Sequence, residues 1–199
     1  GTLGKDEADS GHEARRLGEE GLFEDLRDRN MEALEQREFK RLVTADPHAF
    51  NALTHDYPML PQPVLHHSEL LARLLADGKL PLGHRGQART VTFHDPCYLG
   101  RHNSRYDAPR QVLAALPGVK TVEMERSRNR SFCCGGGSLY LFYEGECDRR
   151  MGELRLDMVE RSGADTVVTA CPFCLINLED AIKTTGREGR IEVIDLAEL

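Results

Sequence analysis

The chain has 199 residues, of which 30% are charged and 40% hydrophobic, and its formal net charge is −7. This balance is typical of a folded soluble domain and excludes a disordered chain. Binding to nucleic acid phosphates requires a basic face, so nucleic acid is not expected as the main partner. No apolar run approaches the roughly 18–20 residues of a membrane-spanning helix, and we expect no span within this sequence.

Helical and strand-like patterns alternate along the chain. Apolar residues at near-helical spacing predict one or two helices over 13–38, a helix starts at Pro47, and a helix capped by Ser68 ends at Gly78. Strands are predicted at 39–44, 64–66, 90–93, 120–124, 166–169 and 191–194, and further helices at 107–116, 146–161, 172–184 and from Leu196. The alternation predicts an α/β fold with mainly parallel sheets flanked by helices.

An internal repeat accompanies this alternation. Residues 43–49 resemble 168–174, and 64–66 resemble 193–195, in the same order and with nearly constant spacing. Such self-similarity predicts a duplicated α/β unit, with part of a first copy in residues 1–86 and the second copy in 87–199. The chain is therefore expected to begin partway through its first copy.

Cysteines gather in the second copy. Cys133 and Cys134 run into three glycines, Cys171 and Cys174 follow a predicted strand, and Cys97 follows another strand. The carboxyl ends of parallel strands meet at one edge of a sheet, so we expect these five cysteines to converge. The sixth cysteine, Cys147, falls on a predicted helix outside the pattern and is expected to be an ordinary core or surface residue.

The chemistry of these positions favours an iron–sulfur cluster. A helix N-terminus after Cys171 stabilises thiolate charge, and glycines after Cys134 leave backbone amides free to donate to sulfur. Five thiolates exceed the needs of a zinc site or a cubane cluster. Cysteine use of this kind points to metal or redox chemistry in the cytoplasm, rather than to structural disulfides.

In the first copy, the corresponding positions hold Ala8, Asp9, Asp46 and Ala49. The two carboxylates would suit a hard metal ion, with His12 or His48 as a further ligand. A vestigial copy kept for packing is the favoured interpretation.

Positive charge is concentrated between Cys97 and Cys133. This charge either forms a solvated surface or serves to offset a negative cluster or dock an acidic redox partner. The residues are Arg101, Arg105, Arg110, Lys120, Arg126, Arg128 and Arg130.

The motif Cys97, Cys133-Cys134-Gly135 and Cys171-Pro172-Phe173-Cys174 resembles the CCG-domain signature of the heterodisulfide reductase catalytic-subunit family. The stretches 94–101 and 106–110 look like the bacterial and archaeal iron–sulfur oxidoreductases of that family. The resemblance implies paired domains that bind [4Fe-4S] clusters, which are noncubane in heterodisulfide reductase. It makes 1–86 a degenerate first CCG repeat and 87–199 the repeat that carries the cluster.

The resemblance implies an iron–sulfur electron-transfer subunit that relays electrons through one cluster. The donor would be a flavoprotein or ferredoxin-type protein, and the acceptor a quinone or disulfide. The location would be the cytoplasm, or the cytoplasmic face of the membrane through a partner subunit. The alternatives are a disulfide or thiol reductase acting at the cluster, a glutaredoxin-like enzyme built on Cys171 and Cys174, and a structural zinc-binding scaffold. Heterodisulfide cleavage is thought to use two facing clusters, so the missing first-copy cysteines argue against it here.

Overall fold

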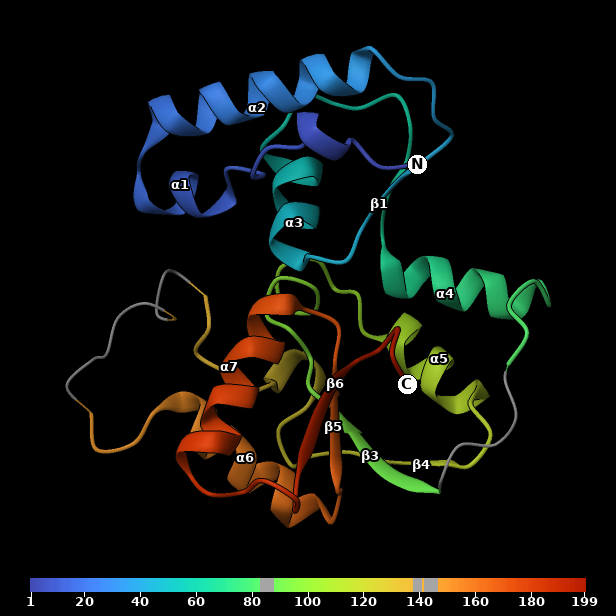
Figure 1. Cartoon of the computed structure of the whole chain (residues 1–199), viewed down its shortest axis with the longest axis vertical. Coiled ribbons are helices and arrows are strands. Elements are labelled where there is room, and N and C mark those ends of the chain that lie inside the picture. Colours follow the sequence, from blue (N-terminus) through green and yellow to red (C-terminus); the bar gives the residue numbers. More distant parts are fainter. Residues whose placement is uncertain (83–87, 138–140, 142–146) are drawn as a thin grey trace.

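The computed structural model describes residues 1–82, 88–137, 141 and 147–199. Its larger sheet has four parallel strands in the order β4-β3-β5-β6 (Figure 1). All residues of β5 are buried, as expected for a central strand covered on both faces. The strands are β3 (Arg89–Phe93), β4 (Val119–Val122), β5 (Thr166–Thr169) and β6 (Glu192–Asp195).

Helices cover both faces of this sheet. Val168 of β5 packs in one apolar cluster with Leu113 and Leu71, and its neighbour Val167 packs in another with Leu156 and Leu178. Successive strand residues point to opposite faces, so α4 and α5 cover one face and α6 and α7 the other. The helices are α4 (His67–Ala76), α5 (Asp107–Ala115), α6 (Met151–Ser162) and α7 (Pro172–Thr184).

The strand order places a switch point between β3 and β5. The chain leaves β3 through α5 to β4 on one side, and leaves β5 through α7 to β6 on the other. Loops that leave adjacent strands in opposite directions open a crevice at the carboxyl edge of the sheet, where α/β proteins bind ligands. Cys97 and Cys171 lie in these two loops.

The N-terminal part is a smaller unit. Strands β1 (Leu42–Thr44) and β2 (Val64–His66) form a parallel pair connected by α3 (Pro47–His55). Helices α1 (His12–Leu17) and α2 (Glu20–Glu35) lie beside α3, and Phe23 of α2 packs with Ala52 and Tyr57. A short 3-10 turn, η1 (Gly4–Asp6), precedes them, and a second one, η2 (Arg128–Arg130), follows β4. Figure 1 shows α3 end to end with α7 at the middle of the molecule.

The two units match in strand register. Leu42 pairs with Val64 as Val167 pairs with Val193, and the next two pairs along the strands also correspond. Both following helices, α3 and α7, have proline at the first helical position, after Asp46 and Cys171 respectively. We keep the duplication, with its boundary near residue 86, as a hypothesis that this matching register supports.

The α/β architecture with parallel sheets is confirmed, whereas some predicted element ends are wrong. Helix α4 is capped by His66 rather than Ser68, because the His66 ring accepts from the Ser68 amide while Glu69 accepts from the His66 amide. Helix α6 starts at Met151, with Arg150 in extended conformation at its cap, and the predicted start at 146 lies outside the described residues. Residues 196–199 form a turn, too short for a helix.

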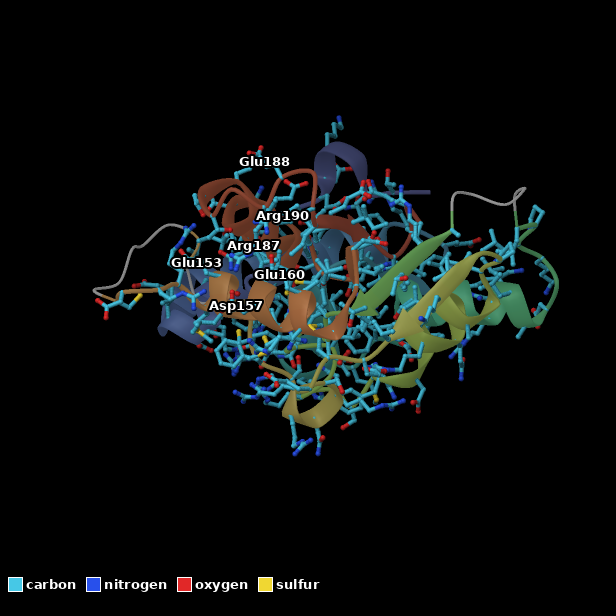
Figure 2. All side chains as sticks on the ribbon, turned by 90° about the horizontal axis from the view of Figure 1, so that it is seen from below. Glu153, Asp157, Glu160, Arg187, Glu188 and Arg190 are labelled. Atoms are coloured by element: carbon cyan, nitrogen blue, oxygen red, sulfur yellow. The ribbon has the colours of Figure 1, made fainter. Side chains whose placement is uncertain are left out.

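Ion pairs fix α6 against the turn that follows α7. Arg187 contacts both Asp157 and Glu160 of α6, and Arg190 reaches Glu160 at 3.6 Å (Figure 2). Arg187 is only 12% exposed, so its pairs are screened less by water than ordinary surface pairs. These ion pairs hold the C-terminal end of α7 against α6. The N-terminal turn of α7 belongs to the cysteine site.

Among the described residues, every helix falls short of the length and apolar character that crossing a membrane requires.

Candidate metal centre

The structure brings the five predicted cysteines together at the switch point. The sulfurs of Cys134 and Cys174 are 3.3 Å apart. Cys133 lies near enough to Cys97 and Cys134, and Cys171 to Cys174, for these thiols to shift one another's pKa. The contacts therefore form one continuous series of thiols: Cys97, Cys133, Cys134, Cys174 and Cys171.

Burial differs along this series. Cys134, Cys171 and Cys174 are at most 3% exposed, whereas Cys97 and Cys133 are half-buried. The site is thus closed on its α7 side and approachable on the side of the Cys97 and Cys133 loops. Cys147 is exposed and precedes α6, so its predicted helical position is wrong.

The loop after Cys134 supplies backbone donors to sulfur. Gly135 N–H donates to Cys133 Sγ and Gly136 N–H donates to Cys134 Sγ, both at 3.3 Å. Gly135 has φ +91°, which disfavours other residues, and a Cβ on Gly136 would lie 2.9 Å from the Phe173 carbonyl oxygen. Glycine is required here because the loop lies against the first turn of α7.

The pKa values of the thiols differ along the series. Hydrogen bonds from Cys134 and Cys97 lower the pKa of Cys133, while the bond to Cys133 raises the pKa of Cys97. Burial by itself raises the pKa of Cys171, but hydrogen bonds from Cys174 and His48 bring it down to about 6. Cysteine binds metal as the thiolate, so the lowered pKa of Cys133 and Cys171 favours metal binding at these positions.

A buried arginine lies beside the sulfurs. Arg155 of α6 is fully buried, donates from Nε to His94 Nδ1 at 3.0 Å and from Nη1 to the Arg126 carbonyl at 2.8 Å. Burial lowers the pKa of Arg155 to about 10, and the charge of Asp95, followed by those of Cys134 and Cys174, opposes that shift. Arg155 is thus cationic at neutral pH and faces the thiols.

His94 stays neutral. Burial, and then the Arg155 charge, lower its pKa to about 3. One nitrogen of His94 lies within 4.8 Å of the sulfurs of Cys134 and Cys174. The position of His94 at the site agrees with its place just before Cys97, whereas Arg155 was not predicted.

Asp95 joins the two half-buried loops. Its carboxylate, 2% exposed, accepts from Arg110 Nη1 at 2.8 Å and Nη2 at 3.0 Å, and from the Arg128 amide at 2.7 Å. The Ser131 hydroxyl donates to the Asp95 carbonyl at 3.1 Å. Asp95 thereby fixes the Cys97 loop against the loop that leads to Cys133.

The first-copy carboxylates are engaged with the backbone. Asp46 accepts from the amides of His48 and Ala49 as the cap of α3, and Asp9 accepts from the Gly11 amide at 2.7 Å. The ligand atoms of Asp46, His48 and Cys171 nevertheless lie within 4.8 Å of one another. The first unit therefore meets the cysteine site through the first turn of α3.

Fold and site together define a cysteine-rich domain of the α/β class, and comparisons with known proteins agree. Residues 91–179 match the family model of the CCG cysteine-rich domain. The chain is 41% identical to the probable iron-sulfur-binding oxidoreductase FadF of Bacillus subtilis (strain 168), over 99% of this chain and 28% of that protein. It is 37% identical to the EtfAB:quinone oxidoreductase of Syntrophomonas wolfei subsp. wolfei, over 100% of this chain and 29% of that protein.

A third relative is archaeal. The chain is 35% identical to a subunit of the dihydromethanophenazine:CoB--CoM heterodisulfide reductase of Methanosarcina barkeri, over 99% of this chain and 49% of that protein. The chain spans less than half the length of each of these three relatives. Residues 91–179 thus carry a CCG cysteine-rich domain, as the cysteine motif predicted, and the chain is similar to iron–sulfur oxidoreductases that include a heterodisulfide reductase subunit.

Proposed function

We propose that the chain is an iron–sulfur electron-transfer domain of an oxidoreductase related to heterodisulfide reductase. In this proposal Cys97, Cys133, Cys134, Cys171 and Cys174 hold one [4Fe-4S] cluster. The observation that supports it best is the unbroken series of thiol contacts at the switch point. The names of two relatives, an iron-sulfur-binding oxidoreductase and a heterodisulfide reductase component, point the same way.

The residues fit such a cluster by their chemistry. Five thiols exceed the four that a cubane cluster takes, which favours a noncubane form. A bound cluster would supply one-electron transfer. The protein residues bind it through sulfur, donate to that sulfur from Gly135 and Gly136, and exclude water on the α7 side. Arg155 places a positive charge against a group that is negative overall.

Electrons would enter or leave on the side of Cys97 and Cys133, which are the half-buried thiols. Exposed arginines stand in the same loops, among them Arg101, Arg126 and Arg128. This charge suits an acidic flavoprotein or ferredoxin-type donor. We infer that the acceptor is a quinone or a disulfide reached through other subunits, and that the domain works in the cytoplasm, where thiols stay reduced.

A disulfide or thiol reductase acting at the cluster is the second candidate, since the half-buried Cys97 and Cys133 offer a disulfide access to the site. It predicts that a disulfide added to the reduced protein reoxidises the cluster, while the relay predicts an unchanged reduced spectrum. A structural zinc site is the third candidate. Zinc takes four ligands and would leave one of the five thiols unused.

Electron paramagnetic resonance during an anaerobic redox titration tests the proposal. We expect a paramagnetic cluster signal in the wild-type protein, its loss or change in Cys134→Ser, and an unchanged signal in Cys147→Ser. Cys147 is the matched control because it is exposed and outside the thiol series. Equal signals in both variants would contradict the ligand set.

A further inference from the structure

A second group of metal-binding side chains lies beside the cysteine site. It consists of His12 and Glu13 of α1 and His48 of α3, and one ligand atom of each lies within 4.8 Å of the others. Glu13 Oε1 is 2.6 Å from His48 Nδ1 and 3.1 Å from His12 Nδ1. His12 is 1% exposed and His48 3%, so both imidazoles are removed from water.

Two polar atoms of this group lack hydrogen-bond partners among the described residues. Within the part of the chain that the structure describes, two of its buried atoms have no hydrogen-bond partner: His12 Nε2 and Glu13 Oε2. Buried polar atoms normally find a partner, because leaving one unpaired costs about 1–3 kcal/mol. The hydrogen bonds of the group thus use only one of the two oxygens of Glu13 and one of the two ring nitrogens of His12.

We propose that His12, Glu13 and His48 bind one first-row divalent transition-metal ion. Two imidazoles and one carboxylate are the ligands that Zn²⁺ and non-haem Fe²⁺ take in proteins. Ligand atoms about 2.1 Å from a common ion are separated by about 3–3.4 Å at right or tetrahedral angles. The His12–Glu13 separation of 3.1 Å is already of this size, and the His48–Glu13 separation of 2.6 Å needs only a small opening.

The other carboxylates nearby are not needed as ligands. Asp46 already accepts from two backbone amides, and Asp9 from one. Glu13 is the carboxylate left to balance the charge of a cation here.

The proposed ion would adjoin the cysteine site through one imidazole. A ring nitrogen of His48 lies within 4.8 Å of the Cys171 sulfur, and the ring lies 4.6 Å from the Phe173 ring and 4.7 Å from the Tyr98 ring, measured between centroids. Aromatic walls of this kind orient a ligating histidine and keep water out. The metal site uses none of the five cysteines, so it does not depend on the cluster proposal.

Mn²⁺ is a suitable probe, because it prefers oxygen and nitrogen donors and competes poorly for thiolates. The experiment titrates anaerobically prepared protein, with its cluster in place, and follows free Mn²⁺ by its electron paramagnetic resonance signal. We expect about one Mn²⁺ bound per chain, released by Zn²⁺, as the order of divalent-metal affinities requires. His12→Gln and Glu13→Gln should weaken binding at least tenfold, and the control Glu20→Gln should leave it unchanged.

Circular dichroism and the iron and sulfide contents establish that each variant is folded and loaded. Wild-type protein that binds no more Mn²⁺ than Glu13→Gln would overturn the proposal and leave a hydrogen-bonded network without an ion. Mn²⁺ bound to protein that contains no iron or sulfide would support this inference while contradicting the proposed function.

Discussion

Arg155 is a buried cation whose hydrogen-bond partners are neutral: the His94 ring, the Arg126 carbonyl and the Met158 sulfur. A buried charge without an opposite charge costs several kcal/mol. The charge of Asp95 offsets part of that cost, and the proposed cluster, which is negative overall, would offset more. Arg155 and a bound cluster would therefore stabilise each other.

Replacing Arg155 by an uncharged residue tests the effect of its charge on the proposed cluster. A unit charge a few ångströms from a redox centre contributes on the order of 2 kcal/mol, or about 90 mV for one electron. Removing a positive charge disfavours the added electron, so Arg155→Met should lower the reduction potential of the cluster by this order. Arg161→Met, on the exposed end of the same helix, should leave it unchanged. Equal potentials in the two variants, measured by spectroscopic redox titration, would contradict the role given to Arg155.

The sequence allowed all five clustered cysteines to be predicted, because cysteine is uncommon and its spacing follows the strand ends. Arg155 and Glu13 were missed because charged residues are frequent and only the fold shows which of them is buried. One signal existed for Arg155. It lies three and four residues from Gly152 and Val159, the spacing of a single helix face, and both of those residues are buried.

At the scale of elements, the loops after β3 and β4 depend on the Asp95–Arg110 pair. Arg110→Ala would leave the buried Asp95 carboxylate without its cation, and we expect a loss of about 3 kcal/mol in the free energy of unfolding. The control Arg161→Ala removes an exposed pair with Glu125 and should cost less than about 1 kcal/mol. Urea unfolding measures both, and similar losses would show that Asp95 does not hold the loops together.

The close approach of the glycine loop to α7 gives another element-scale prediction. In Gly136→Ala the new Cβ would meet the Phe173 carbonyl oxygen at 2.9 Å, so the loop must move away from the helix. We expect destabilisation by about 1–3 kcal/mol and a shifted cluster spectrum. Gly21→Ala is the control, because it lies in α2 with open space around it and should be neutral or stabilising. A fully stable Gly136→Ala with an unchanged spectrum would refute the packing argument.

Element order was predictable from periodicity and turn residues, and the strands of the second unit fall close to the expected positions. Element ends were harder. His66 acts as a helix cap through its ring nitrogen, a use of histidine that sequence patterns rarely signal, so the prediction chose the ordinary capping residue Ser68. Helix α6 starts only at Met151, because Arg150, the residue at its cap, is extended.

At the scale of the whole molecule, His66 lies between the two units. Its buried ring faces the backbone of Ala45 in the first unit and of Ala170 in the second. Burial, and then the charge of His67, lower the pKa of His66 to about 3, from about 6.5 in an unfolded chain. Asp195 and Glu69 are the acidic groups that face this pair of histidines.

Stability should therefore depend on pH below neutrality. In the unfolded state His66 binds a proton near pH 6.5, whereas in the folded state it binds one only near pH 3. The contribution of His66 is fully present above pH 6.5 and is lost at up to about 1.4 kcal/mol per pH unit as pH falls towards 3. Urea unfolding at pH 7 and pH 5.5 should show a smaller loss in His66→Asn than in wild-type protein. His55→Asn, an exposed control, should keep the wild-type loss, and identical pH dependence in all three proteins would argue against His66.

The contact between the two units could not be predicted. The repeat indicated that the first unit lacks its thiols, but a sequence comparison does not show that α3 faces α7 and brings His48 to Cys171. That contact follows from tertiary packing, where small local preferences are outweighed by the burial of rings such as His48 and Phe173.

The five cysteines are proposed to hold an iron–sulfur cluster, and quantifying iron, acid-labile sulfide and zinc in anaerobically prepared protein is the decisive measurement. We expect about four irons and about four sulfides per chain in the cluster, and their loss in Cys134→Ser but not in Cys147→Ser. Zinc without iron or sulfide in protein kept free of oxygen would contradict it.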